Sequence, residues 1–164
     1  MDPEALGRLF NEHSAALALY ARQWCAAPDD VVQQAFINLA ALGRPPERPV
    51  AWLYRAVRNA ALNAACAARR RRRHEGAAAQ ARTWFAAFDA TALDAEAATA
   101  ALQGLPPEQR EVIVARLWGG LTFEQIGELT ETSASTAYRA YVAGLESLRD
   151  RLGEPCPNRS PTRP

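Results

Sequence analysis

The sequence predicts an all-α protein of two small helical bundles joined by a linker, with a helix-turn-helix in the second bundle. Apolar residues recur at spacings of three and four along most of the 164-residue chain, the period of an amphipathic helix. No segment alternates apolar and polar residues as a half-buried strand does. Prolines and glycines separate the periodic segments. The expected ranges are 1–73 for the first bundle, 74–99 for the linker, 100–152 for the second bundle and 153–164 for a disordered tail.

The first bundle opens with two predicted helices. Residues 2–25 form the first, since Pro3 suits an opening turn. Its apolar positions are Leu6, Leu9, Phe10, Leu17 and Tyr20. Pro28 starts the second helix, where Asp29 and Asp30 place carboxylates at the positive end of the helix dipole. The apolar stripe of this helix is Val32, Phe36 and Leu39.

The third predicted helix, Val50–Arg70, has two chemically different faces. It follows a stiff loop, Gly43–Pro49, whose three prolines cannot continue a helix. The apolar face is Leu53, Val57, Ala60 and Ala64. The opposite face is Arg55, Arg58, Asn59 and Asn63, with Trp52 at its edge. Arginines, amides and an exposed aromatic ring can grip phosphates and stack on an unpaired base. The alternative is a solvated face with a tryptophan in the core.

Positive charge is concentrated at the end of this helix. Arg69–Arg73 is a run of five arginines, whose mutual repulsion is expected to fray the helix and end the first bundle. It would form a phosphate patch or a solvated linker. The net charge of +1 hides a segregated layout, with −2 on residues 1–49, +7 on 50–82 and −4 on 83–164. The middle block is therefore the electrostatic candidate for nucleic acid.

The region between the bundles, Glu75–Gln103, is rich in alanine and carries three aromatic residues that suggest a short amphipathic helix. These are Trp84, Phe85 and Phe88. Gly104–Pro107 marks the boundary of the second bundle, and Glu108 opens a helix after a proline at its start. The residues expected to pack that helix onto the helix-turn-helix are Val112, Ile113, Ala115, Arg116 and Leu117.

Residues 105–152 carry the local signals of a helix-turn-helix. Thr122 and Gln125 are three residues apart, as in a capping box, where each side chain bonds the backbone amide of the other. A hydrophobic staple flanks this cap, formed by Leu121 and Ile126. The polar run that follows the short helix is long enough for a turn, and Ser133 can cap the next helix. The apolar positions are Phe123, Ile126 and Leu129, then Tyr138, Tyr141, Leu145, Leu148 and Leu152.

The second helix of such a unit enters the DNA major groove. The alternative is a helical hairpin in an ordinary bundle. Residues 133–152 carry a net charge of only +1, and phosphate contacts dominate affinity for DNA. By itself this helix is therefore expected to bind DNA weakly.

Several other classes of protein lack support in the sequence. No apolar run approaches the ~20 residues of a membrane span, and the N-terminus lacks the pattern of a secretory signal. A cytoplasmic protein is therefore expected. The cysteines and histidines complete no metal-ligand spacing; they are Cys25, Cys66, Cys156, His13 and His74. No nucleophile motif or glycine-rich phosphate loop is present, so we expect no enzymatic activity, no metal and no cofactor.

With these residues in view, the chain resembles a bacterial RNA polymerase sigma factor of the extracytoplasmic-function type. The resemblance covers about residues 5–72 and 100–152. From Leu105 to Leu152 the sequence is similar, without gaps, to the family's promoter-reading helix-turn-helix. The segment PDDVVQQAFINLAAL resembles the helix that docks on the polymerase clamp. The segment RPVAWLYRAVRNAALNAACAARRRRR resembles the helix that melts and reads the downstream promoter element.

The resemblance implies that the protein directs core polymerase to promoters by recognising the −35 element and melting the −10 element. The implied partners are the largest and second-largest polymerase subunits, promoter DNA and, where one exists, an anti-sigma factor. The residues implied to face the clamp of the largest subunit are Asp30, Gln33 and Phe36. Those implied to engage the −10 element are Trp52, Arg55, Arg58 and Asn59, with the loop 43–50 holding a flipped base. Those implied to approach the −35 element are Ser135, Thr136, Tyr138 and Arg139.

Three departures from the family's pattern have consequences. Glu131 stands in the turn, where the family usually has Gly; a left-handed backbone would strain Glu, so an altered turn is expected. The recognition helix is less polar than usual at Tyr138, Ala140, Val142 and Ala143, which implies weaker upstream contact. Gln34 replaces an acidic residue, which implies softer docking on the clamp.

Two other functions stay open on the sequence alone. One is a stand-alone helix-turn-helix regulator that binds duplex DNA tightly as a dimer without the polymerase. The other is a helical adaptor that has kept the fold and lost DNA binding. Such an adaptor would keep its function when Arg139, or Arg55 and Arg58 together, are replaced by Ala.

Overall fold

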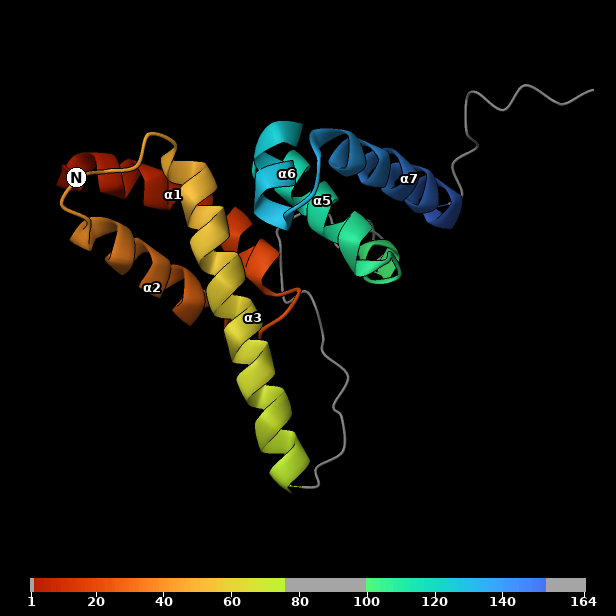
Figure 1. Ribbon diagram of the computed structural model, residues 1–164, viewed down its shortest axis with the longest axis horizontal. Coiled ribbons are helices and arrows are strands. Elements are labelled where there is room, and N and C mark those ends of the chain that lie inside the picture. Colours follow the sequence, from red (N-terminus) through yellow and green to blue (C-terminus); the bar gives the residue numbers. More distant parts are fainter. Residues whose placement is uncertain (1, 76–99, 153–164) are drawn as a thin grey trace, which may run out of the picture.

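The computed structural model describes residues 2–75 and 100–152, and within these ranges it contains helices and no strand (Figure 1). In chain order the helices are α1 (Pro3–Ala21), α2 (Pro28–Ala41), α3 (Pro49–Glu75), α5 (Pro107–Leu117), α6 (Phe123–Thr130) and α7 (Ala134–Leu152). Helices α1 to α3 form one unit and α5 to α7 another, which confirms the all-α class with two helical bundles. The predicted helix around Phe85 and the predicted disordered tail lie outside the described residues.

Local signals place the first two helices. The carboxylate of Asp2 accepts a hydrogen bond from the backbone amide of Ala5 at 3.2 Å and caps α1. Helix α1 ends at Ala21, earlier than predicted, and Pro28 opens α2. The chain must leave helical geometry between them, because the residue before a proline avoids it. Ala27 accordingly has φ −118° and ψ 70°.

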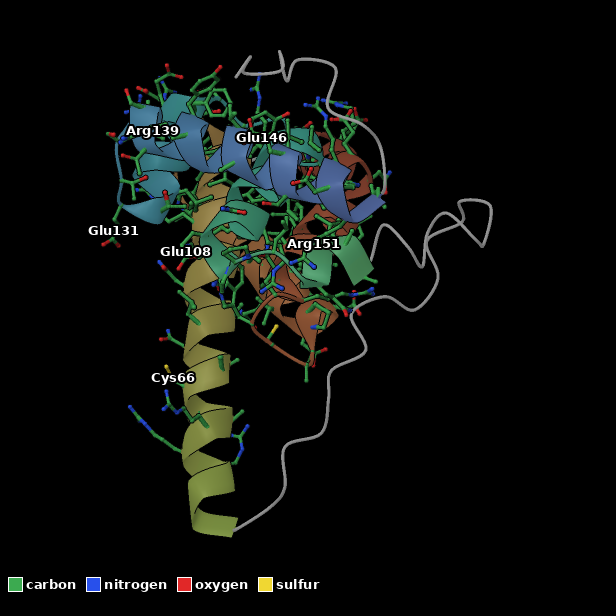
Figure 2. The ribbon with its side chains drawn as sticks, turned by 90° about the vertical axis from the view of Figure 1, so that its right-hand side faces the viewer. Cys66, Glu108, Glu131, Arg139, Glu146 and Arg151 are labelled. Atoms are coloured by element: carbon green, nitrogen blue, oxygen red, sulfur yellow. The ribbon has the colours of Figure 1, made fainter. Side chains whose placement is uncertain are left out.

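Helix α3 is longer than the sequence suggested. It continues through the arginine run to Glu75, so the prediction that the helix ends there is wrong. Arginine is a good helix former, and positive charge favours the C-terminal end of the helix dipole. Its second half extends away from the rest of the molecule, with Cys66 on that portion (Figures 1 and 2). Arg69, Arg70 and Arg71 are exposed, so solvent screens their like charges.

The second unit forms the caps that the sequence predicts. The backbone amide of Thr122 donates to Gln125 Oε1 at 2.8 Å, and the amide of Gln125 donates to Thr122 Oγ1 at 3.3 Å. This confirms the capping box. The amide of Thr136 donates to Ser133 Oγ at 3.1 Å, which confirms the cap of α7. The helix-turn-helix of α6 and α7 is therefore specified by bonds between residues three apart.

The turn between α6 and α7 differs from what we expected of Glu131. This residue has φ 58° and ψ 38°, so the left-handed turn is kept and the expectation of an altered geometry is wrong. Its amide donates to the carbonyl of Gly127, as does the amide of Thr132 at 2.8 Å. These bonds satisfy the end of α6 and hold a non-glycine residue in a conformation that costs an L-residue about 1–2 kcal/mol.

Replacing Glu131 with Gly should therefore stabilise the protein. We expect the free energy of unfolding to rise by about 1 kcal/mol, because glycine adopts the left-handed region without steric cost. Urea denaturation of the purified chain measures this change in the free energy of unfolding. Glu131→Ala removes the same carboxylate but keeps the strained Cβ, so it should bring no gain. Equal stability of the two variants would show that the carboxylate, rather than the backbone, sets the effect.

The two helical units are in contact. Helix α1 packs on α5 and α3 packs on α6, and the buried residues form one continuous cluster through both units. At the contact, Gly119 follows α5 and faces Tyr54 of α3 so closely that an added Cβ would lie 2.7 Å from Tyr54 Cζ. This packing could not be predicted from the sequence, because it depends on residues far apart in the chain.

Candidate nucleic-acid and polymerase interfaces

The leading end of α7 is an accessible face. Ser135, Tyr138 and Arg139 are exposed and Thr136 is half-buried, so the four predicted contacts with the −35 element lie together on one turn and a half of helix. Figure 2 labels Arg139 at this end of α7. Its guanidinium donates to Thr136 Oγ1 at 3.3 Å and to the carbonyl of Ser135 at 3.4 Å. In the free protein the arginine lies along its own helix.

An aromatic cluster holds α7 in place from behind. The ring of Phe123 in α6 meets those of Tyr138 and Tyr141 edge to face, with centroids 5.3 and 5.5 Å apart. The guanidinium of Arg116 lies 5.0 Å from the centre of the Phe123 ring and donates to the carbonyl of Leu121 at 2.7 Å. The sequence predicted these residues as packing positions. Their arrangement fixes the angle at which α7 is presented.

The polar face of α3 is partly covered by the second unit. Arg55 and Asn59 are exposed and Trp52 is half-buried against the core. Arg58 lies inward with only 20% of its side chain exposed, and its Nε donates to Glu111 Oε1 of α5 at 2.8 Å. The prediction that Arg58 lies on a solvated face is therefore wrong. Its partner is 53 positions away in the chain, so a helical projection of α3 cannot find it.

Glu111 is the centre of a buried polar network. Its Oε1 also accepts a hydrogen bond from the Tyr20 hydroxyl at 2.6 Å. Burial, and then the neighbouring carboxylate, raise the pKa of Tyr20, which keeps its hydroxyl neutral as a donor. Burial by itself lowers the pKa of Arg58, but the hydrogen bond and the charge of Glu111 outweigh it, so the net shift is upward. A second, exposed ion pair joins Arg55 to Glu128 of α6 at 3.8 Å.

The Tyr54 hydroxyl is buried, and no group among the residues that the structure describes forms a hydrogen bond with it. Burial raises its pKa, and a buried hydroxyl without a partner costs about 1–3 kcal/mol. We therefore expect Tyr54→Phe to raise the free energy of unfolding by about 1 kcal/mol in urea denaturation. The matched variant Tyr20→Phe removes a hydroxyl that donates to Glu111, so it should lower stability instead. The same sign for both changes would contradict this assignment.

The residues predicted to face the polymerase differ in their exposure. Asp30 and Gln33 are exposed on α2, whereas Phe36 is 5% exposed and meets Phe10 of α1 edge to face at 5.0 Å. The prediction that Phe36 faces outward is wrong, since it belongs to the apolar stripe of the helix. The exposed apolar residue of α2 is Ile37, with 52% of its surface accessible. Sequence periodicity could have found it, because Ile37 falls outside that stripe.

Comparisons with known proteins point to one family. Residues 95–148 match the family described as "Sigma-70, region 4". The chain is 33% identical over 144 residues to the RNA polymerase sigma factor CarQ of Myxococcus xanthus, covering 79% of this chain and 76% of that one.

Two solved structures share the fold. One is the sigma factor RpoE of Bartonella quintana, solved with the anti-sigma factor NepR; its TM-score is 0.70 at 19% identity, covering 93% of this chain and 98% of that one. The other is CnrH, solved with the cytosolic domain of CnrY; its TM-score is 0.59 at 24% identity, covering 93% and 90%. Within the described residues, no helix is both long and apolar enough to span a membrane. The region 4 match, the relative and the shared fold together place this chain among the RNA polymerase sigma factors, in the extracytoplasmic-function type.

Proposed function

We propose that this sigma factor reads promoters with two surfaces, the leading end of α7 and the polar face of α3, while the polymerase supplies all the chemistry. The observation that carries the proposal is the exposed leading end of α7, which the aromatic contacts of Phe123 with Tyr138 and Tyr141 anchor to α6. A helix presented in this way fits a major groove end-on. The proposed cellular location is the cytoplasm, where core polymerase and promoter DNA are found.

At the −35 element, Arg139 would be the main sequence-reading contact. A guanidinium can bond two acceptors of guanine at once in the major groove. Ser135 and Thr136 are short hydroxyl side chains suited to phosphates and base edges. Tyr138, with 54% of its surface exposed, offers a ring for contact with sugar or a thymine methyl. The unit carrying them, residues 100–152, has five arginines and seven acidic residues, so its affinity for duplex DNA should be low without the polymerase.

At the −10 element, Trp52, Arg55, Arg58 and Asn59 would hold the melted non-template strand. Bases of a single strand can stack on an aromatic ring while arginines track the phosphates. The loop 43–50 would receive a flipped base, whose unstacking costs a few kcal/mol. The arginine run that begins at Arg69 extends the same helix and would attract the strand over a longer distance.

On the polymerase side, Asp30 and Gln33 would meet the clamp of the largest subunit. They lie on the exposed face of α2, and the neighbouring Ile37 adds an apolar centre to that face. A polar rim around an apolar residue is a common pattern at protein interfaces. Contacts with the second-largest subunit would come from the second unit. An anti-sigma factor, where one exists, would compete for these surfaces.

The test is transcription in vitro from fragmented genomic DNA of the host. Purified protein plus core polymerase should yield transcripts with defined starts, and core polymerase alone should not. A mobility-shift assay of the protein without polymerase provides the second arm. A tight, specific complex there, with no transcript in the first arm, would identify a stand-alone regulator and overturn the proposal.

A further inference from the structure

We propose that Thr136 is a positioning residue, which orients the guanidinium of Arg139 at the leading end of α7 before DNA binds. It acts through Arg139, and this role replaces a direct contact between Thr136 and the −35 element. The hydrogen bonds that carry the proposal belong to the free protein. Their effect on promoter choice rests on the function proposed above, in which Arg139 reads a base.

The hydrogen bonds start at the cap of α7. Ser133 Oγ accepts from the backbone amide of Thr136 at 3.1 Å, and the carbonyl of Ser133 accepts from the amide of Ala137 at 2.9 Å. The cap therefore fixes the Ser133 hydroxyl relative to the helix. This hydroxyl lies 2.9 Å from Thr136 Oγ1, and one of the two donates to the other. The Thr136 side chain is thereby tied to the start of the helix.

Arg139 completes this set of hydrogen bonds (Figure 2). Side chains of a helix lean toward its N-terminus, which brings the guanidinium back over the turn that contains Thr136. Its Nη2 donates to Thr136 Oγ1 at 3.3 Å, and its Nε donates to the carbonyl of Ser135 at 3.4 Å. Bonds from two different nitrogens set the direction of the guanidinium plane. Both are longer than the usual ~2.9 Å, so they can yield to the better acceptors of a base pair.

Both acceptors of Arg139 are neutral. Within residues 2–75 and 100–152, no carboxylate forms an ion pair with it. A carboxylate would orient the guanidinium, but it would also compete with DNA for the same charge-assisted bonds. A hydroxyl and a backbone carbonyl orient it while its charge stays available. Thr136 is half-buried and its hydroxyl already has two partners, so little of its bonding capacity is left for DNA.

An oriented guanidinium has two advantages for reading a base. It loses less rotamer freedom on binding than a freely moving one. A bidentate contact with guanine also requires the guanidinium plane to align with the base edge. We therefore expect Thr136 to determine how strongly Arg139 favours guanine over the other bases.

The first experiment follows Arg139 in the free protein by NMR. The heteronuclear NOE of its Nε–Hε group reports how firmly the side chain is held, and Arg139→Lys identifies the signal. Thr136→Val keeps the shape of the side chain but lacks the oxygen, so the NOE should fall. Thr136→Ser should preserve it. An unchanged NOE in Thr136→Val would refute the positioning.

Ser147→Ala is the matched control for the loss of a hydroxyl from α7. Ser147 Oγ donates to the carbonyl of Ala143 at 2.9 Å, farther along the helix than Arg139. The variant should leave the NOE of Arg139 unchanged. A decrease as large as that in Thr136→Val would show that any lost hydroxyl loosens the helix, and it would contradict the specific role of Thr136.

The second experiment measures base preference with core polymerase. The template is an identified promoter whose −35 positions are randomised, each copy carrying a transcribed barcode. Sequencing of the transcripts then gives the preference at each position. We expect Arg139→Ala to remove a preference for guanine at one position. Thr136→Val should reduce the same preference about fivefold, as expected when one flexible side chain must be ordered on binding. Thr136→Ser should keep it.

The double variant shows whether Thr136 acts through Arg139. Thr136→Val should lower transcription from the wild-type promoter in the natural chain, but should cause no further loss when Arg139 is already Ala. The same loss in both backgrounds would mean a direct contact with DNA or a weakened helix, and it would overturn the proposal. Arg139→Ala with unchanged base preference would instead overturn the reading of bases by Arg139. The NMR comparison contains no DNA, so it tests the positioning separately from that function.

Discussion

Gly127→Val is expected to disrupt the helix-turn-helix and abolish promoter-specific transcription. A Cβ at this position would lie 2.9 Å from the carbonyl oxygen of Thr132 and 3.0 Å from the amide nitrogen of Ala134. Both are backbone atoms of the turn, so relief requires moving the start of α7 relative to α6. Valine adds two further methyl groups, and we expect a loss of about 3 kcal/mol, at the upper end for an overpacked site. Urea denaturation and transcription with core polymerase measure the two effects.

Gly7→Ala is the matched control for this substitution. Gly7 also lies inside a helix, α1, but within the described part of the chain an added Cβ would meet no atom within 4 Å other than its chain neighbours and the backbone of its own helix. Alanine should stabilise the protein there by about 0.5–1 kcal/mol, because it restricts the unfolded chain and suits a helix. Unchanged stability of Gly127→Val would mean that the turn adjusts freely, contrary to its close backbone contact.

The second large effect is expected from replacing Arg55 and Arg58 together with Ala. If both arginines engage the −10 strand, each substitution removes a charge-assisted contact of about 1.5–3 kcal/mol. Transcription from an identified promoter should therefore fall at least about a hundredfold. A template that is already melted over the −10 region should not restore transcription, because the protein variant lacks its contacts with the melted strand.

Arg8→Ala is the control for the loss of an arginine. Arg8 lies exposed on α1 and forms an (i, i+4) ion pair with Glu4 at 3.9 Å. Its removal should leave transcription unchanged. Arg55→Ala alone separates DNA contact from folding, since Arg58 then still neutralises the buried Glu111. Full activity of the double variant would show that these two arginines do not engage the −10 strand.

The sequence predicted the helical architecture well because its signals are local. Prolines at the starts of α2, α3 and α5 act within a single turn. The caps by Thr122 and Ser133 join residues three positions apart, so they can be read without knowing the rest of the fold. The candidate contacts at the leading end of α7 came from the resemblance to the family instead, because periodicity placed Tyr138 among the apolar positions, whereas 54% of its surface is exposed.

The candidate site was less predictable where one position had to satisfy two roles. Phe36 was assigned both to the apolar stripe of α2 and to the polymerase face, and a side chain in the core cannot do both. Helical projection also left Tyr54 and Ala61 off the apolar face of α3, although both are fully buried. Their burial requires neighbours from other helices, among them Tyr20, whose ring packs against Tyr54 at 4.9 Å.

The sequence by itself determined where the helices begin, the caps of α6 and α7, and the order of the two units, because those depend on interactions within one or two turns. Only the tertiary structure decided that Arg58 pairs with Glu111 and that Glu131 keeps a left-handed backbone. The first depends on two helices meeting across the molecule. The second depends on the turn's hydrogen bonds to Gly127 and on the packing of α6 against α7. Together they hold Glu131 in a backbone conformation that is unfavourable for a non-glycine residue.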